Sequence, residues 1–137
     1  MVTGRADPMH EAPMLRPFLL TLTLLAALPA EAETRCGWYH NPTPGNVFLQ
    51  DADGQWWIST QGNAPAPGFE EAYTPAFDNR VRIDYAGEVT QRYGFSCACA
   101  DGKFSNGDAL SISRLREIPM ARCEGDPKLP PVQLYGQ

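Results

Sequence analysis

Histidine is scarce in this chain. It has two histidines, and only His40 lies in the part that we expect to fold. A single histidine excludes a multi-histidine metal site, and a Ser-His-Asp or Cys-His catalytic arrangement would have to use it. His40 precedes a proline-rich turn, where a histidine on the surface or bonded to the backbone is ordinary. We therefore expect no metal, no cofactor and no enzymatic activity.

Long apolar runs are also lacking. Residues 17–28 are apolar but too few to cross a bilayer as a mature helix. Arg16 precedes them and Ala30-Glu31-Ala32 follows, which is typical of a secretory signal peptide. We expect residues 1–32 to be removed without lipid attachment, with Met14 as the start of translation. The mature protein is then periplasmic or extracellular, with no stable membrane insertion.

Basic charge is low. Removal of residues 1–32 leaves 9 Lys and Arg against 13 Asp and Glu. A general nucleic-acid binder needs a basic face, so we exclude nucleic acid as a partner. The mild acidity is compatible with a basic partner, and it is also ordinary for exported proteins.

Four cysteines lie in the mature part: Cys36, Cys97, Cys99 and Cys123. An even number in a small exported chain predicts two disulfides. Cys97 and Cys99 lie on one face of a strand and would need a strained loop to bond each other, so each pairs with Cys36 or Cys123. We slightly favour Cys97–Cys123 with Cys36–Cys99. A four-thiolate zinc site is disfavoured by the C-x-C spacing.

The mature chain has no convincing helical pattern and no internal repeat. We expect the first strand to end at the prolines of 41–46, and a loop over 61–79. Alternation predicts the strands, at 35–40, 47–60 (a hairpin turning at Asp53-Gly54), 81–85, 93–100 and 110–113. The fold class is all-β: residues 33–128 form a small single domain of antiparallel hairpins with two disulfides, and 129–137 form a weakly ordered tail.

The hairpin over 47–60 has two distinct faces. Its apolar face carries Val47, Leu49, Trp56 and Ile58, and its other face carries Phe48, Gln50, Trp57 and Ser59. The strand at 81–85 shows the same alternation, with Val81, Ile83 and Tyr85 on the face expected to be buried.

Aromatic residues are dense near the start of the domain. Trp57 and Tyr39 offer large, rigid contact area for a sugar ring or a peptide. His40 and Asn41 lie beside them in the sequence. We therefore predict a binding surface made of Trp57, Tyr39, His40 and Asn41.

Acidic residues give no catalytic pattern. Asp51 and Asp53 resemble the start of a calcium loop, but the further ligands of such a loop are absent and a hairpin turn explains them better. Carboxylate pairs for glycoside hydrolysis can be imagined from Asp51, Glu70, Glu71 and Asp84, without any distinctive spacing.

Several motifs together resemble one family. They are Cys36-Gly37-Trp38, Asn41-Pro42-Thr43-Pro44, Asn46, Trp56-x-Ile58, Gln61-Gly62, Tyr93-Gly94-Phe95-x-Cys97-x-Cys99 and a late Cys123. The chain is similar to a small exported bacterial family classed as a domain of unknown function, from which it departs over 80–92. The resemblance implies export and one small domain, and assigns no activity or catalytic residue.

These observations favour a monomeric, non-catalytic binding module of the periplasm or cell envelope. Its partner would be an envelope protein or a glycan. Two alternatives stay open. One is a cell-wall or carbohydrate-binding module or weak glycan hydrolase, and the other is a purely structural envelope component.

Overall fold

The computed structural model describes residues 3–5, 8, 13 and 28–135. Most of the predicted signal peptide, including Met14, therefore lies outside the described residues. Within the described part of the chain, no helix is long and apolar enough to span a membrane.

The described residues form mostly strands, which confirms the all-β class. In chain order the elements are β1 (Glu33–Thr43), β2 (Asn46–Asp51), β3 (Gly54–Ser59), α1 (Phe69–Ala72), α2 (Pro75–Asp78), β4 (Arg82–Ile83), β5 (Val89–Thr90), β6 (Gly94–Ser105), β7 (Asp108–Glu117) and α3 (Met120–Glu124). The three helices are single turns that sequence alternation does not reveal, and two of them lie in the predicted loop 61–79.

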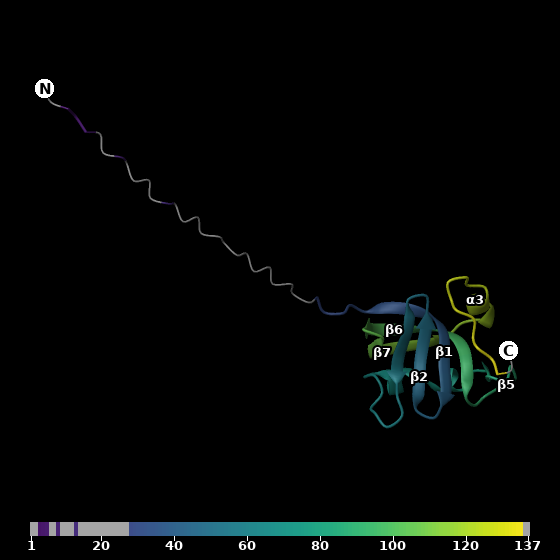
Figure 1. Cartoon of the computed structure of the whole chain (residues 1–137). Helices are drawn as coiled ribbons and strands as arrows, with labels where there is room; N and C mark the ends of the chain where they lie inside the picture. The colour runs from purple at the N-terminus through teal and green to yellow at the C-terminus, as the bar shows by residue number, and fades with distance from the viewer. Residues whose placement is uncertain (1–2, 6–7, 9–12, 14–27, 136–137) are drawn as a thin grey trace.

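Five of the strands close into a barrel (Figure 1). β1 pairs antiparallel with both β2 and β6, and β7 pairs with β6 and with β3, so the closed order is β1-β2-β3-β7-β6-β1. The β3–β7 pairing is parallel, where Trp57 lies opposite Asp108. This corrects the prediction of antiparallel hairpins alone. Strand order and pairing match the topology of an OB-fold barrel.

The barrel interior is the main core. Tyr39 of β1, Leu49 of β2 and Ile112 of β7 are almost fully buried there. Ala72 of α1 and Phe77 of α2 join the same cluster, so the two helical turns pack against the core instead of forming a free loop. The hairpin faces are as predicted, because the buried residues are Val47, Leu49 and Ile58, with Trp56 packed against them.

β1 is longer than predicted and continues through Pro42. Its pairing with β2 shifts register between His40 and Thr43. Because a bulge leaves backbone groups out of the ladder, it tolerates a residue without an N–H. The prolines therefore do not end the strand at residue 40, and the turn is confined to Pro44 and Gly45.

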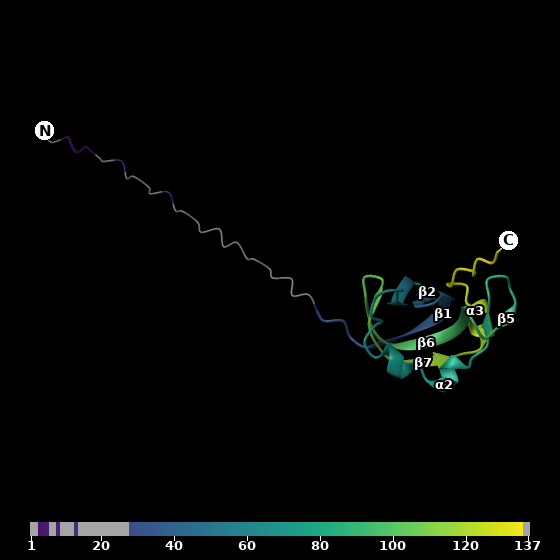
Figure 2. The same cartoon turned by 90° about the horizontal axis from the view of Figure 1, so that it is seen from below.

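A second apolar cluster lies outside the barrel, beneath the C-terminal segment. Trp38, Phe95, Cys97 and Cys123 form its buried centre. The segment after α3 lies beside the barrel on the same side as β5 (Figures 1 and 2). Trp38 Nε1 donates a hydrogen bond of 3.1 Å to the carbonyl of Pro130. Residues 129–135, for which the sequence predicts weak order, thus contact the domain.

The strand predicted at 81–85 is reduced to two residues, and the face predicted to be exposed is also buried. Arg80 and Arg82 are 3% and 4% exposed, whereas Val81 is 50% exposed. β4 pairs with β6 through Ile83 and Phe95. Ile83 and Tyr85 are half-buried against the second apolar cluster, as alternation predicts. Both faces of the segment are therefore covered, and polarity alone does not predict the burial of the arginines.

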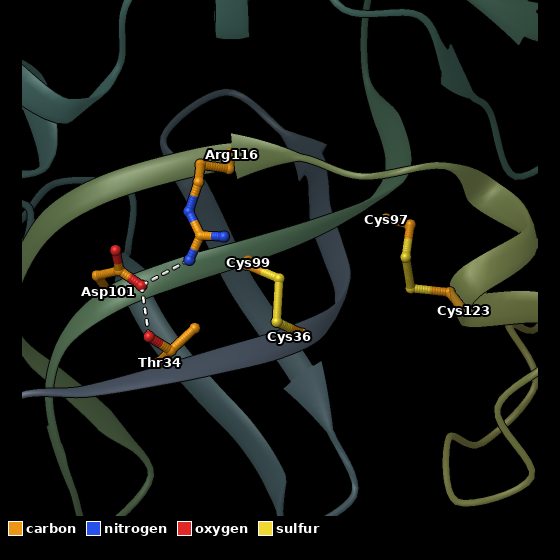
Figure 3. The surroundings of a disulfide bond; sticks show 7 residues. All are labelled: Thr34, Cys36, Cys97, Cys99, Asp101, Arg116 and Cys123. Atoms are coloured by element: carbon orange, nitrogen blue, oxygen red, sulfur yellow. Dashed lines mark hydrogen bonds and ion pairs between the residues drawn. A yellow bond between two sulfur atoms is a disulfide. The ribbon is translucent and has the colours of Figure 1, made fainter.

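Both disulfides are present with the favoured pairing, Cys36–Cys99 and Cys97–Cys123. Figure 3 shows them at nearby positions of β6, one reaching β1 and the other α3. In the same view, Asp101 accepts hydrogen bonds from Thr34 and Arg116. β6 is therefore cross-linked to both ends of the domain.

Candidate functional site

A row of aromatic rings crosses the outer side of the barrel wall. Trp57 of β3 contacts Phe48 of β2, with ring centroids 4.9 Å apart. Phe48 stacks on His40 of β1 at 4.5 Å, and His40 stacks on Tyr85 at 6.0 Å. Strand alternation places these side chains outside, because their neighbours Tyr39, Leu49 and Ile58 point into the barrel.

An open cavity of about 340 Å³ lies along this row. Its lining is aromatic and amide-bearing and comes from the barrel wall and the C-terminal segment. The lining residues are His40, Pro42, Phe48, Gln50, Gln55, Tyr85, Pro131, Val132, Gln133 and Tyr135. Since none of them is acidic or permanently charged, the cavity suits a neutral ring or an apolar side chain. We call it the aromatic pocket.

His40 is the polar centre of the aromatic pocket. Its Nδ1 lies 2.8 Å from the Tyr85 hydroxyl, while its buried Nε2 has no hydrogen-bond partner. Burial lowers the pKa of His40 to about 4, and the neighbouring Gln50 side chain opposes this. The imidazole is therefore neutral at pH 7 and contributes an uncharged ring to the stack.

Two of the predicted surface residues lie elsewhere. Tyr39 is 1% exposed, because alternation along β1 turns it into the barrel, where it packs against Phe77. It cannot belong to a binding surface. The Asn41 side chain donates to the carbonyls of Thr43 and Asn46, so it holds the turn between β1 and β2. Of the four residues, the structure brings only His40 and Trp57 into one row.

The acidic turn forms a structural network away from this row. Arg35 Nη1 contacts Asp51 Oδ2 at 2.8 Å and Asp53 Oδ2 at 3.0 Å. Burial raises the pKa of the Asp51 carboxyl, but hydrogen bonds from Trp56 and Arg35 outweigh it and hold that pKa below its ordinary value. Asp51 is thus an ionised partner of Arg35. Across the described residues, no group of three or more His, Cys, Asp or Glu could hold a metal ion.

The family model described as "Protein of unknown function (DUF4087)" matches residues 30–130. The chain belongs to this family. The match covers the barrel, both disulfides and α3, in agreement with the resemblance seen in the motifs. No curated protein and no solved structure matches the chain.

Two residues of the aromatic row in this DUF4087 domain, Phe48 and Tyr85, were not predicted as site residues from the sequence. Phe48 shares a face with Trp57 in the hairpin pattern, so alternation was a sufficient signal for it. Tyr85 gave no such signal. It reaches His40 because β4 pairs with β6 and carries residues 84–85 alongside the barrel, a placement that depends on tertiary pairing.

Another cavity, of about 470 Å³, lies between Trp38 and the C-terminal segment. Its lining is mostly apolar, and the indole N–H of Trp38 is already bonded to Pro130. We interpret this cavity as the incompletely filled space between the barrel and the segment that covers it.

Proposed function

We propose that this DUF4087 protein is an exported, non-catalytic binding module, and that the aromatic pocket is its binding site. One observation carries the proposal: an open, uncharged pocket lined by stacked rings and by side-chain amides. Rigid aromatic surface supplies contact area at low entropic cost, and a few polar groups provide orientation. The pocket also lies on the outer side of the β1–β3 wall, the side on which OB-folds commonly bind ligands, an analogy of architecture.

The absence of acidic residues from this lining favours binding over hydrolysis. Glycoside hydrolysis requires a pair of carboxylates that flank the scissile bond. Asp51, which the sequence offered for this role, is engaged by Arg35 and Trp56 instead. The two disulfides are consistent with export to an oxidising compartment.

The preferred partner is an uncharged apolar or aromatic segment of an envelope protein. A neutral glycan is the second candidate, because the amides of Gln50 and Gln55 lie beside the rings and can bond sugar hydroxyls. Both candidates use the same ring surface, so the same variants test them.

The test compares immobilised wild-type protein with the Phe48→Ser variant in capture from an envelope extract. A parallel tryptophan-fluorescence titration uses neutral N-acetylglucosamine oligosaccharides. Leu110→Ser is the matched control, because Leu110 is 48% exposed and lies outside the pocket lining. We expect one defined partner or one oligosaccharide to bind wild type and the control but not the Phe48 variant. Equal binding by all three proteins, or no binding by wild type, contradicts the proposal.

Export has a separate test. The mass of the protein recovered from the periplasm should correspond to a chain beginning at Glu33, without lipid. A species that retains Arg16 or carries acyl chains contradicts this prediction.

A further inference from the structure

Two guanidinium groups are buried next to one another behind α2. Arg80 donates to Ser96 Oγ at 2.9 Å and to the carbonyl of Phe77. Arg82 donates to the carbonyls of Gln91 and Arg92 at 2.7 and 3.0 Å, and to the Tyr73 hydroxyl at 2.9 Å. Every one of these acceptors is neutral.

Aromatic rings and backbone carbonyls surround the charge of this pair, but no carboxylate pairs with it. In the described part of the chain, the carboxylates within ion-pair distance of an arginine lie beside Arg35 or Arg116, and none lies beside Arg80 or Arg82. Arg80 Nη2 and Arg82 Nε are buried without a hydrogen-bond partner. Burying a charge is costly unless it is paired, so two adjacent unpaired guanidiniums favour the arrival of an anion.

A cavity of about 370 Å³ opens beside Arg82. Its lining is mainly polar and joins the end of β1, the helical turns and the segment before β6. The lining residues are Asn41, Tyr73, Asp78, Arg82, Gln91, Arg92 and Tyr93. Two guanidiniums face a single carboxylate in this lining, and Arg80 adds a third positive charge behind it. The cavity is therefore electropositive within an acidic protein.

We propose that this cavity binds an oxyanion, a phosphate or carboxylate group of a small ligand, with Arg82 and Arg92 as its charged partners. The guanidinium fork matches the oxygen geometry of both groups and forms charge-assisted hydrogen bonds with them. This oxyanion site is independent of the aromatic pocket, with which it shares no lining residue.

The test titrates inorganic phosphate and, separately, acetate into the purified protein at constant ionic strength, with sodium chloride as the reference. Amide chemical shifts of residues 91–93 report binding. The informative variant is Arg92→Gln, because Arg92 is exposed and its removal leaves the contacts of Arg82 with the backbone in place. Arg122→Gln is the matched control, since Arg122 is also exposed but lies in α3, outside the cavity lining.

We expect saturable shifts with at least one of the two anions, and the tighter of the two identifies the ligand group. Loss of one charge-assisted contact in Arg92→Gln should weaken that binding by about tenfold, while Arg122→Gln leaves it unchanged. Shifts that do not saturate or that sodium chloride reproduces overturn the proposal. Equal weakening by both variants does so as well, because it indicates a response to net charge alone.

Discussion

Trp56 and Trp57 are neighbours in β3 whose side chains lie on opposite sides of the barrel wall. Trp56 packs against the core, donates to Asp51 at 3.0 Å and lies under the guanidinium of Arg35 at 3.9 Å. Trp57 contacts Phe48 on the outer side. The two indoles therefore have different roles in stability.

We expect Trp56→Ala to lower the free energy of unfolding by about 3–5 kcal/mol, because it removes a large core side chain. It also removes the indole that donates to Asp51 and contacts Arg35. Trp57→Ala should cost clearly less. Urea denaturation of both variants measures the difference. Equal costs would mean that both sides of the wall are equally buried.

His40 predicts a specific dependence of stability on pH. Its pKa is about 4 in the folded protein and 6.5 in the unfolded chain. Between these values the unfolded chain binds a proton that the folded protein does not, so the free energy of unfolding falls as the pH drops from 6.5 towards 4. The full loss of stability, reached below pH 4, is about 3 kcal/mol, and no stability is lost above pH 6.5.

The variant His40→Phe keeps a ring in the stack and should lose this part of the pH dependence. Urea denaturation at several pH values between 4 and 7 compares the slopes of the two proteins, which makes any change in overall stability irrelevant. Identical slopes would show that His40 does not titrate in this way.

At the level of the elements, β1 depends on a glycine where it passes β2. A Cβ at Gly37 would meet the backbone carbonyl of Gln50, and neither strand can move away because both belong to the closed barrel. Gly37→Ala should therefore cost about 1–3 kcal/mol through overpacking. Thermal unfolding measures this, with the exposed Leu110→Ala as control. A cost no larger than that of the control would show that the strands separate freely.

The hairpin of β2 and β3 was predictable because one side faces an apolar core and the other does not, which is the condition under which alternation is informative. β7 shows where that condition weakens. Its buried residues Ala109, Ile112 and Leu115 are three apart, because two register shifts in its pairing with β6 interrupt the alternation. In the sequence, Leu115 breaks the alternation of residues 110–113, which is typical of a bulge or a strand end.

The burial of the arginines at β4 could not be predicted, for a different reason. Arg80 and Arg82 are buried by contacts with aromatic rings and backbone carbonyls from distant segments, such as Tyr39 and Gln91. Polarity assigns arginine to solvent, and only the assembled fold reveals the acceptors. The oxyanion site therefore could not be predicted from the sequence, whereas two of the four rings in the aromatic row, Trp57 and His40, were predicted.

For the whole molecule, closure of the barrel rests on long-range pairing that no local pattern specifies. The pairing of β3 with β7 joins Trp57 to Asp108, and that of β1 with β6 brings Cys36 opposite Cys99. Only the number of cysteines indicated that Cys36 of β1 lies near β6. Two disulfides and strand alternation thus sufficed for the class of the fold but not for its topology.

The disulfides should contribute strongly to the stability of so small a domain. Cys36–Cys99 closes 63 residues and Cys97–Cys123 closes 26. On the chain-entropy model their removal costs about 4 and about 3.5 kcal/mol respectively. Paired Cys→Ala variants, compared by urea denaturation, measure each contribution. Unchanged stability in either variant would contradict the expectation.

The attachment of both bridges to β6 has a mechanical consequence. From Cys36 a covalent path runs to Cys99, through Ala98 to Cys97, and across to Cys123. A pulling force applied to the two ends of the domain follows this path, so the barrel between them carries no load. In single-molecule stretching, we expect the oxidised protein to lengthen only at its tails. After reduction the whole barrel should extend. An oxidised domain that unravels under tension would show that the bridges do not shield it.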